Sequence, residues 1–205
     1  MARPTEPLKP WDVLLYRNYG WLGDAIGWAE SAQNGDSQYS HVAMVYPDLA
    51  QGFEQNPPCV HLFDLETVPW DRVDAVRLSV GGVDFFNDPQ AVQASLEQAT
   101  KLLHFKQNSD GTWSGEPYDY GFIAKALGVG LLEHIGLEGL AGKIMQQAQS
   151  TQHEIVCSNT AEVVANAGLH LVHPLLRLEP VWVGVGAMRP SDWPLSPLVR
   201  GLKTT

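Results

Sequence analysis

Residues 153–168, HEIVCSNTAEVVANAG, decide the expected fold of this chain because they place a cysteine at the start of a helix. A short apolar run leads into Cys157, and small or apolar residues then recur at helical spacing. This pattern predicts a buried helix with Cys157 on its first turn. Glycine often follows the last turn of a helix, so Gly168 is expected to end this one.

A cysteine in this position has a favourable setting for chemistry. Unpaired backbone N–H groups and the positive end of the helix dipole favour a thiolate over a thiol. The same N–H groups can stabilise the oxyanion that forms when sulfur attacks a carbonyl group. A small buried cysteine that only packs in the core is the alternative, and for a lone cysteine it is the commoner case.

Length and composition fit one globular domain. A chain of 205 residues can bury a full core, and 44% hydrophobic with 18% charged residues argues against wholesale disorder. The formal net charge of −10 argues against nucleic acid, and against an anionic membrane surface, as electrostatically bound partners. Because no linker or internal repeat divides the sequence, we expect a single domain over residues 1–205.

Cysteine and histidine usage gives no sign of a disulfide framework or a metal cluster. Cys59 and Cys157 stand far apart in the sequence. His170 and His173 have a spacing that can bind metal, but they lack nearby acidic or cysteine partners. No metal is therefore expected, and the thiol chemistry described above needs no organic cofactor.

The N-terminus shows no signal-peptide pattern, and the longest apolar segment, residues 121–132, is too short to span a bilayer. We expect a protein made in the cytosol, which leaves open its export as a phage or secretion-system protein. The oligomeric state is left open as well.

The first half of the chain predicts an antiparallel sheet. Short β-rich segments are separated by turn residues, among them Pro57 and Pro58. A helix is expected at residues 20–32. Strands are expected at residues 13–16, 41–47, 52–55, 59–63 and 74–79.

The second half predicts mainly helices. Asn87 or Asp88 can cap a helix with Pro89 in its first turn. Its apolar stripe would consist of Val92, Leu96, Ala99 and Leu103. Residues 107–117 are rich in turn-forming residues throughout, and apolar, glycine-broken helices are expected over 118–145. A late strand at 181–188 and an irregular proline-rich tail complete an expected α+β fold, in which helices pack on the sheet.

A thiolate nucleophile needs a base, and the base needs an orienting group. His41 is the candidate base because it opens a strand directly after a polar loop. Glu54 is the candidate orienting group, since the next strand of a hairpin can bring it beside the imidazole ring. His61 on the following strand is the alternative for that role. His153 precedes Cys157 by one helical turn, but its loop position favours a structural or solvent role.

The order of these motifs resembles the NlpC-type papain-like hydrolases. The matching parts are the strand at residues 11–16, YSHVAMVYP at 39–47, GFEQ at 52–55, GEPYDYG at 115–121 and VCS at 156–158. The histidine part precedes the cysteine part. That order is similar to the circularly permuted branch of the family, which includes permuted amidase-like bacterial and phage proteins and lecithin:retinol acyltransferase-like acyltransferases.

The resemblance covers roughly residues 10–170 and implies a papain-like, circularly permuted NlpC-type core. It implies that Cys157 is the nucleophile, His41 the base and Glu54 the third member of a triad. Tyr118 and Ser158 would lie near the oxyanion.

The sequence departs from the family pattern at two positions. Trp11 stands where the family usually has glycine, which should affect only the entry turn. Asn159 stands where many permuted members have glutamate, which leaves the outer contacts of the helix undefined.

The resemblance implies a thiol hydrolase of amide or ester bonds, and first an amidase or peptidase that acts on peptides such as those of the bacterial cell wall. The alternative is a lipid acyl hydrolase or acyltransferase with transient membrane contact, whose acyl chain the apolar segment 121–145 could seat. A third reading is a binding module that kept the fold without activity, and the presence of all three candidate catalytic residues argues against it.

Overall fold

A computed structural model describes residues 3–17, 39–118, 128, 131, 157–178 and 190–202 of the chain. Several sequence predictions lie outside these residues. They are the helix at 20–32, most of the apolar segment at 118–145, His153 and the strand at 181–188.

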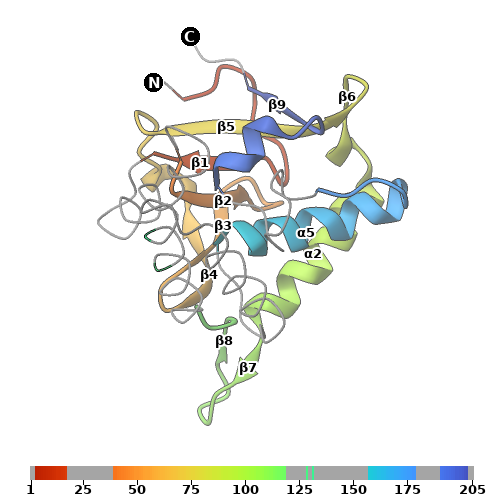
Figure 1. The fold of residues 1–205 in the computed structure, drawn as a ribbon. Helices are drawn as coiled ribbons and strands as arrows, with labels where there is room; N and C mark the ends of the chain where they lie inside the picture. The colour runs from red at the N-terminus through yellow and green to blue at the C-terminus, as the bar shows by residue number, and fades with distance from the viewer. Residues whose placement is uncertain are drawn as a thin grey trace.

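An antiparallel sheet forms one layer of the structure (Figure 1). Its strands run in the order β4 (Cys59–Asp64), β3 (Gln51–Asn56), β2 (His41–Val45), β1 (Val13–Tyr16) and β5 (Val73–Val80). Two short strands, β6 (Val83–Asp84) and β9 (Val199–Gly201), also pair with β5. The five strands expected in the first half of the chain are all found close to their predicted positions.

The two central strands are buried on both faces of the sheet. Side chains alternate between the faces of a strand, so a run that is apolar at every position fits only a strand covered on both sides. On the helix side lie Val13, Leu15, Val42 and Met44. On the opposite side lie Leu14, Tyr16, Ala43 and Val45.

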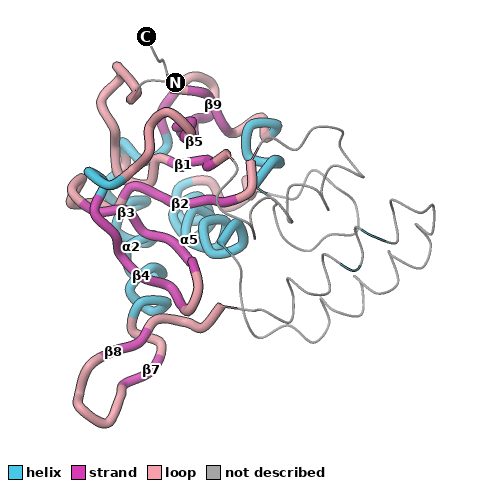
Figure 2. The backbone as a smooth tube through the Cα atoms, turned by 90° about the vertical axis from the view of Figure 1, so that its left-hand side faces the viewer, coloured by secondary structure: helices cyan, strands magenta, loops and turns pink. Residues whose placement is uncertain are grey.

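Two helices pack side by side against the sheet (Figures 1 and 2). α2 (Pro89–Leu103) begins after Asp88, whose carboxylate accepts a hydrogen bond from the Gln90 N–H at 2.8 Å, as the capping pattern predicted. α5 (Cys157–Val172) packs on β2 and β3. The chain therefore has the α+β fold expected from its sequence. Short 3₁₀ helices are η1 (Leu65–Thr67), η2 (Phe85–Asn87) and η3 (Pro190–Leu195).

The prediction that Gly168 ends the cysteine helix is wrong, because α5 continues to Val172. Gly168 lies where the two helices approach each other closely. A Cβ atom at this position would come within 2.6 Å of both the Ala91 carbonyl oxygen and the Ser95 hydroxyl. The Ser95 hydroxyl also donates to the Val164 carbonyl at 2.7 Å. The glycine therefore permits the helix contact.

The buried face of α2 also differs from the predicted apolar stripe, because α2 packs closely against α5. Small side chains line the contact with α5, and the larger apolar ones flank it and are only partly buried. The buried positions are Ala91, Ser95, Ala99 and Leu102. Of the predicted stripe, Ala99 alone is buried, while Val92, Leu96 and Leu103 are intermediate.

Two segments predicted to be irregular contain strands. Within the expected loop at 107–117, β7 (Lys106–Gln107) pairs with β8 (Trp113–Ser114) in a hairpin that projects from the rest of the chain (Figure 1). In the tail, β9 follows η3 and pairs with β5. Such two- and three-residue strands are too short to leave a periodic signal.

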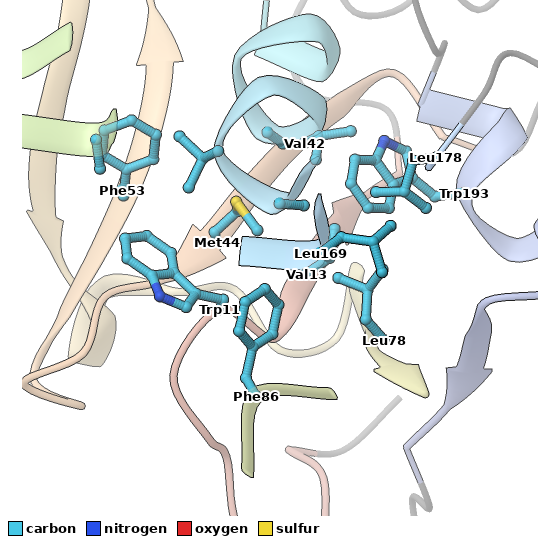
Figure 3. Packing of buried hydrophobic residues seen from close by; sticks show 14 of the residues in the cluster. Trp11, Val13, Val42, Met44, Phe53, Leu78, Phe86, Leu169, Leu178 and Trp193 are labelled. Carbon is cyan, nitrogen blue, oxygen red and sulfur yellow. The ribbon is translucent and has the colours of Figure 1, made fainter. Parts of the chain in front are cut away.

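The main core lies between the sheet and the two helices (Figure 3). Trp11, which is fully buried, packs edge-to-face against Tyr46 and Phe53, and its indole N–H donates to the Val92 carbonyl at 3.2 Å. The φ angle of Trp11 is +64°, a left-handed conformation that glycine adopts without strain. This is the position where the resembled family usually has glycine.

Candidate active site

The register of the sheet brings Glu54 to His41. Glu54 on β3 is directly opposite Ala43 on β2, so it lies diagonally from His41, two residues along that strand. The Nε2–H of His41 donates to the Glu54 carboxylate, with Nε2 2.6 Å from Oε2. Both side chains are only 6% exposed. The hydrogen bond predicted between these two residues is therefore present.

Cys157 is the first residue of α5 and is buried. Its thiol is hydrogen-bonded to the side chain of His41. The Nε2 atom of the same ring faces Glu54. Cys157, His41 and Glu54 thus form one continuous hydrogen-bonded series that joins the start of a helix to two neighbouring strands.

The electrostatics of this series favour a charged histidine. Burial by itself lowers the pKa of His41, because the imidazolium loses its hydration. The negative charge and hydrogen bond of Cys157, followed by those of Glu54, outweigh burial and raise the pKa of His41 from its ordinary 6.5 to about 10. These interactions therefore favour the imidazolium form of His41.

Glu54 is held as a carboxylate for a related reason. Burial raises the pKa of Glu54, but hydrogen bonds from His41 and His61 outweigh it and lower the pKa from 4.5 to about 2. The Nε2 atom of His61 lies 3.2 Å from Oε1, the carboxylate oxygen that does not face His41. Glu54, and not the alternative His61, is thus the group in contact with His41.

A buried glutamine fixes the helix to the sheet beside these residues. The Gln55 side chain is fully buried, and its Nε2 atom donates to the Pro117 carbonyl at 2.9 Å. Its Oε1 atom accepts a hydrogen bond from the Thr160 hydroxyl on the first turn of α5. Sequence analysis missed Gln55 and Thr160. The available signal was the pair of adjacent polar residues in GFEQ, which point to opposite faces of a buried strand.

The two residues expected near the oxyanion lie in different settings. Tyr118 is buried and directly follows Pro117, whose carbonyl accepts the hydrogen bond from Gln55. The backbone N–H of Tyr118 donates to the Pro58 carbonyl at 3.0 Å. The hydroxyl of Ser158 accepts a hydrogen bond from the Trp193 indole at 3.0 Å and so faces the core. A contribution of Ser158 to an oxyanion site would therefore come from its backbone N–H at the start of α5.

The remaining thiol and the other predicted histidines are separate from this series. Cys59 is half-buried at the start of β4 and forms an isolated bridge with Pro117. His173 packs against the Phe85 ring, and His170 is exposed. Within the part of the chain that the structure describes, no group of three or more acidic, histidine or cysteine side chains is arranged to hold a metal ion. No helix in that part is both long and apolar enough to cross a membrane.

No protein-family model matches this sequence, and no curated protein sequence matches it. The inference of function therefore depends on the arrangement of Cys157, His41 and Glu54. A thiolate can attack a carbonyl carbon, an imidazolium can protonate a leaving group, and a buried carboxylate can hold the imidazolium in place.

Proposed function

We propose that this protein is a thiol hydrolase that cleaves amide or ester bonds with Cys157, His41 and Glu54. The observation that carries the proposal is the buried hydrogen-bonded series from the thiol through the imidazole to the carboxylate. Nucleophile, base and orienting group in contact are the arrangement that activates a thiol. This chemistry requires neither a metal nor an organic cofactor.

In the proposed mechanism His41 already holds the proton of Cys157 as an imidazolium, and the thiolate attacks the substrate carbonyl carbon. Backbone N–H groups at the start of α5 stabilise the tetrahedral oxyanion. The intermediate collapses as His41 protonates the departing amine or alcohol, which leaves an acyl group on the sulfur. His41 then removes a proton from water, which attacks the thioester, releases the acid and restores the thiol. Glu54 stabilises the imidazolium throughout.

We propose an amide or peptide bond as the first substrate class, such as those in cell-wall peptides. The support is the resemblance to the circularly permuted branch of the NlpC-type papain-like hydrolases. The order of histidine, acid and cysteine along the chain agrees with that branch, and so does the left-handed backbone of Trp11 where the family has glycine. A protein made in the cytosol would have to reach such a substrate after export.

A lipid acyl ester is the second candidate, and a specific feature favours it. The segment at 121–145 is rich in apolar residues, and its described residue Leu131 is 52% exposed. Such a segment could seat an acyl chain. The net charge of −10 works against binding to an anionic membrane, so we expect the lipid substrate to come from a membrane surface without net charge.

An activity screen tests both candidates together. Wild type, Cys157→Ala and the matched control Cys59→Ala would be incubated with peptidoglycan fragments and with phosphatidylcholine vesicles. We expect product from wild type and Cys59→Ala and none from Cys157→Ala. Product formation that survives in Cys157→Ala would contradict the proposal. The substrate that is cleaved selects between the two classes.

A further inference from the structure

A second imidazole contacts the carboxylate of the proposed triad. His61 lies directly opposite Glu54 in the pairing of β3 with β4. Its Nε2 atom is 3.2 Å from Oε1 of Glu54, and Oε2 of the same carboxylate is 2.6 Å from Nε2 of His41. Glu54 therefore lies between two histidines, with one carboxylate oxygen for each.

The two hydrogen bonds of His61 can both form only when the ring is charged. Its Nδ1 atom lies 2.9 Å from the backbone carbonyl oxygen of Cys59, which can only accept a hydrogen bond. Its Nε2 atom faces a carboxylate oxygen, which when ionised is also only an acceptor. A neutral imidazole has one N–H and would satisfy one of these partners, whereas an imidazolium has two and satisfies both.

The surroundings of His61 are consistent with a proton that exchanges with solvent. The His61 side chain is 39% exposed, compared with 6% for Glu54. The charged groups that act on it are Glu54 on β3, whose hydrogen bond raises the pKa of His61, and His41 on β2, whose positive charge opposes this. The carbonyl of Cys59 on its own strand adds a further acceptor.

We propose that His61 is a positioning residue of the hydrolase site, which in its charged form donates to Oε1 of Glu54 and thereby holds Oε2 on His41. The inference rests on the proposed function. A carboxylate with one oxygen fixed has lost the rotation that would carry the other oxygen away from the imidazole. Loss of the proton from His61 removes one of the two bonds, so the orientation of Glu54 depends on the charge of a partly exposed group.

The test compares two substitutions of His61 by the reactivity of Cys157, in the absence of substrate. In His61→Gln the amide nitrogen can still donate close to the original Nε2 position, whereas His61→Leu has no donor. The control is His104→Leu, since His104 is exposed and stacks on Trp113 of the projecting hairpin. The rate constant of iodoacetamide alkylation at Cys157 would be measured by peptide mapping at neutral pH.

We expect His61→Leu to lower the alkylation rate about tenfold, the effect of losing one hydrogen bond to a charged group. His61→Gln should stay within about twofold of wild type, and His104→Leu should match wild type. Equal rates in His61→Leu and wild type would overturn the inference. An equal loss in His61→Gln and His61→Leu would overturn it too, because a donated bond would then not be what matters.

A second measurement separates this inference from the proposed function. The protonation of His61 would be followed by NMR of its ring nitrogens in wild type and in Glu54→Gln. We expect a doubly protonated ring at neutral pH in wild type and a lower pKa in Glu54→Gln. A titration of His61 that is identical in the two proteins would overturn the pairing. If Cys157 reacts no faster than Cys59, the proposed function fails, and the NMR result decides the pairing of His61 with Glu54 independently.

Discussion

Two polar networks in this molecule, each with a buried centre, differ in the kind of charge that they hold. The first is the series Cys157, His41, Glu54 and His61. The second, called here the arginine network, consists of Glu6, Asp12, Arg77, Asp84 and Arg200. In the first network the pKa of His41 is raised to about 10 and that of Glu54 is lowered to about 2, whereas the guanidinium groups of the second are permanently charged.

Arg77 at the centre of the arginine network uses its full hydrogen-bonding capacity. It forms a two-bond pair with Asp12, with both distances 2.7 Å, and it also donates to Glu6, Asp84 and the Pro7 carbonyl. A guanidinium has five N–H groups, and each is satisfied here. The network ties the N-terminal segment to β5 and β6. A permanently charged arginine is thus at the centre of one network, and the titratable pair of His41 and Glu54 is at the centre of the other.

The largest expected effect is a loss of turnover when the first network is changed. Cys157→Ala and His41→Ala should each lower turnover by about a thousandfold or more, and the double mutant should be little worse than either, because members of one catalytic unit are strongly non-additive. Steady-state kinetics on the substrate found in the screen would measure this. Additive losses in the double mutant would mean that the two residues do not share a step.

The next effect is on the arginine network and should appear in stability alone. Arg77→Met leaves the buried carboxylate of Asp12 without its partner, so the free energy of unfolding should fall by about 3–5 kcal/mol. Arg72, an exposed residue paired with Asp71 at 3.7 Å, is the matched control, and Arg72→Met should change stability by less than about 1 kcal/mol. Urea denaturation measures both.

The alkylation rate of Cys157 should be unchanged in the folded Arg77→Met protein. A changed rate would show that the two networks are coupled.

A smaller effect is expected from Glu54→Gln, which keeps the shape of the side chain and removes its charge. Turnover should fall by about ten- to a hundredfold, less than in Cys157→Ala, because the amide oxygen can still accept from His41. The pKa of His41, raised to about 10 in part by Glu54, should fall, so the basic limb of the kcat/KM profile should move to lower pH. An unmoved basic limb would remove Glu54 from the unit.

The smallest expected effect is the pH dependence of folding stability that the site contributes. The lowered pKa of Glu54 stabilises the fold above pH 4.5, and this contribution is lost as pH falls toward 2. The raised pKa of His41 stabilises it below pH 6.5, and this contribution is lost as pH rises toward 10. The free energy of unfolding of wild type should therefore exceed that of the double mutant His41→Leu/Glu54→Leu by the largest amount between pH 4.5 and 6.5. Denaturation of both proteins across this pH range measures the difference. A difference that is constant with pH would contradict both shifts.

Local sequence patterns were sufficient for much of the fold and for the contact between His41 and Glu54. The strands carry short β-rich runs, and a hairpin between neighbouring strands sets which side chains meet. The helix that carries Cys157 was also visible, because small and apolar residues recur at helical spacing after it.

Features that depend on distant residues could not be predicted. Gly168 resembles a helix stop in sequence, and only the backbone of α2 beside it shows that it permits a contact. Asp12 and Arg77 are 65 residues apart, and no periodicity connects them. In the sequence, Gln55 is one polar residue within a strand. Its hydrogen bond with Thr160 becomes visible only when α5 is packed against the sheet.

The most direct test of the central claim is the competition of the two cysteines for iodoacetamide at neutral pH. Cys157 is only 5% exposed, whereas Cys59 is half-buried, so accessibility alone would label Cys59 first. A thiolate paired with His41 reverses this order. We expect faster alkylation at Cys157 in wild type, and Cys59 first in His41→Ala. Faster or equal alkylation of Cys59 in the wild-type protein would contradict the assignment of Cys157 as the nucleophile.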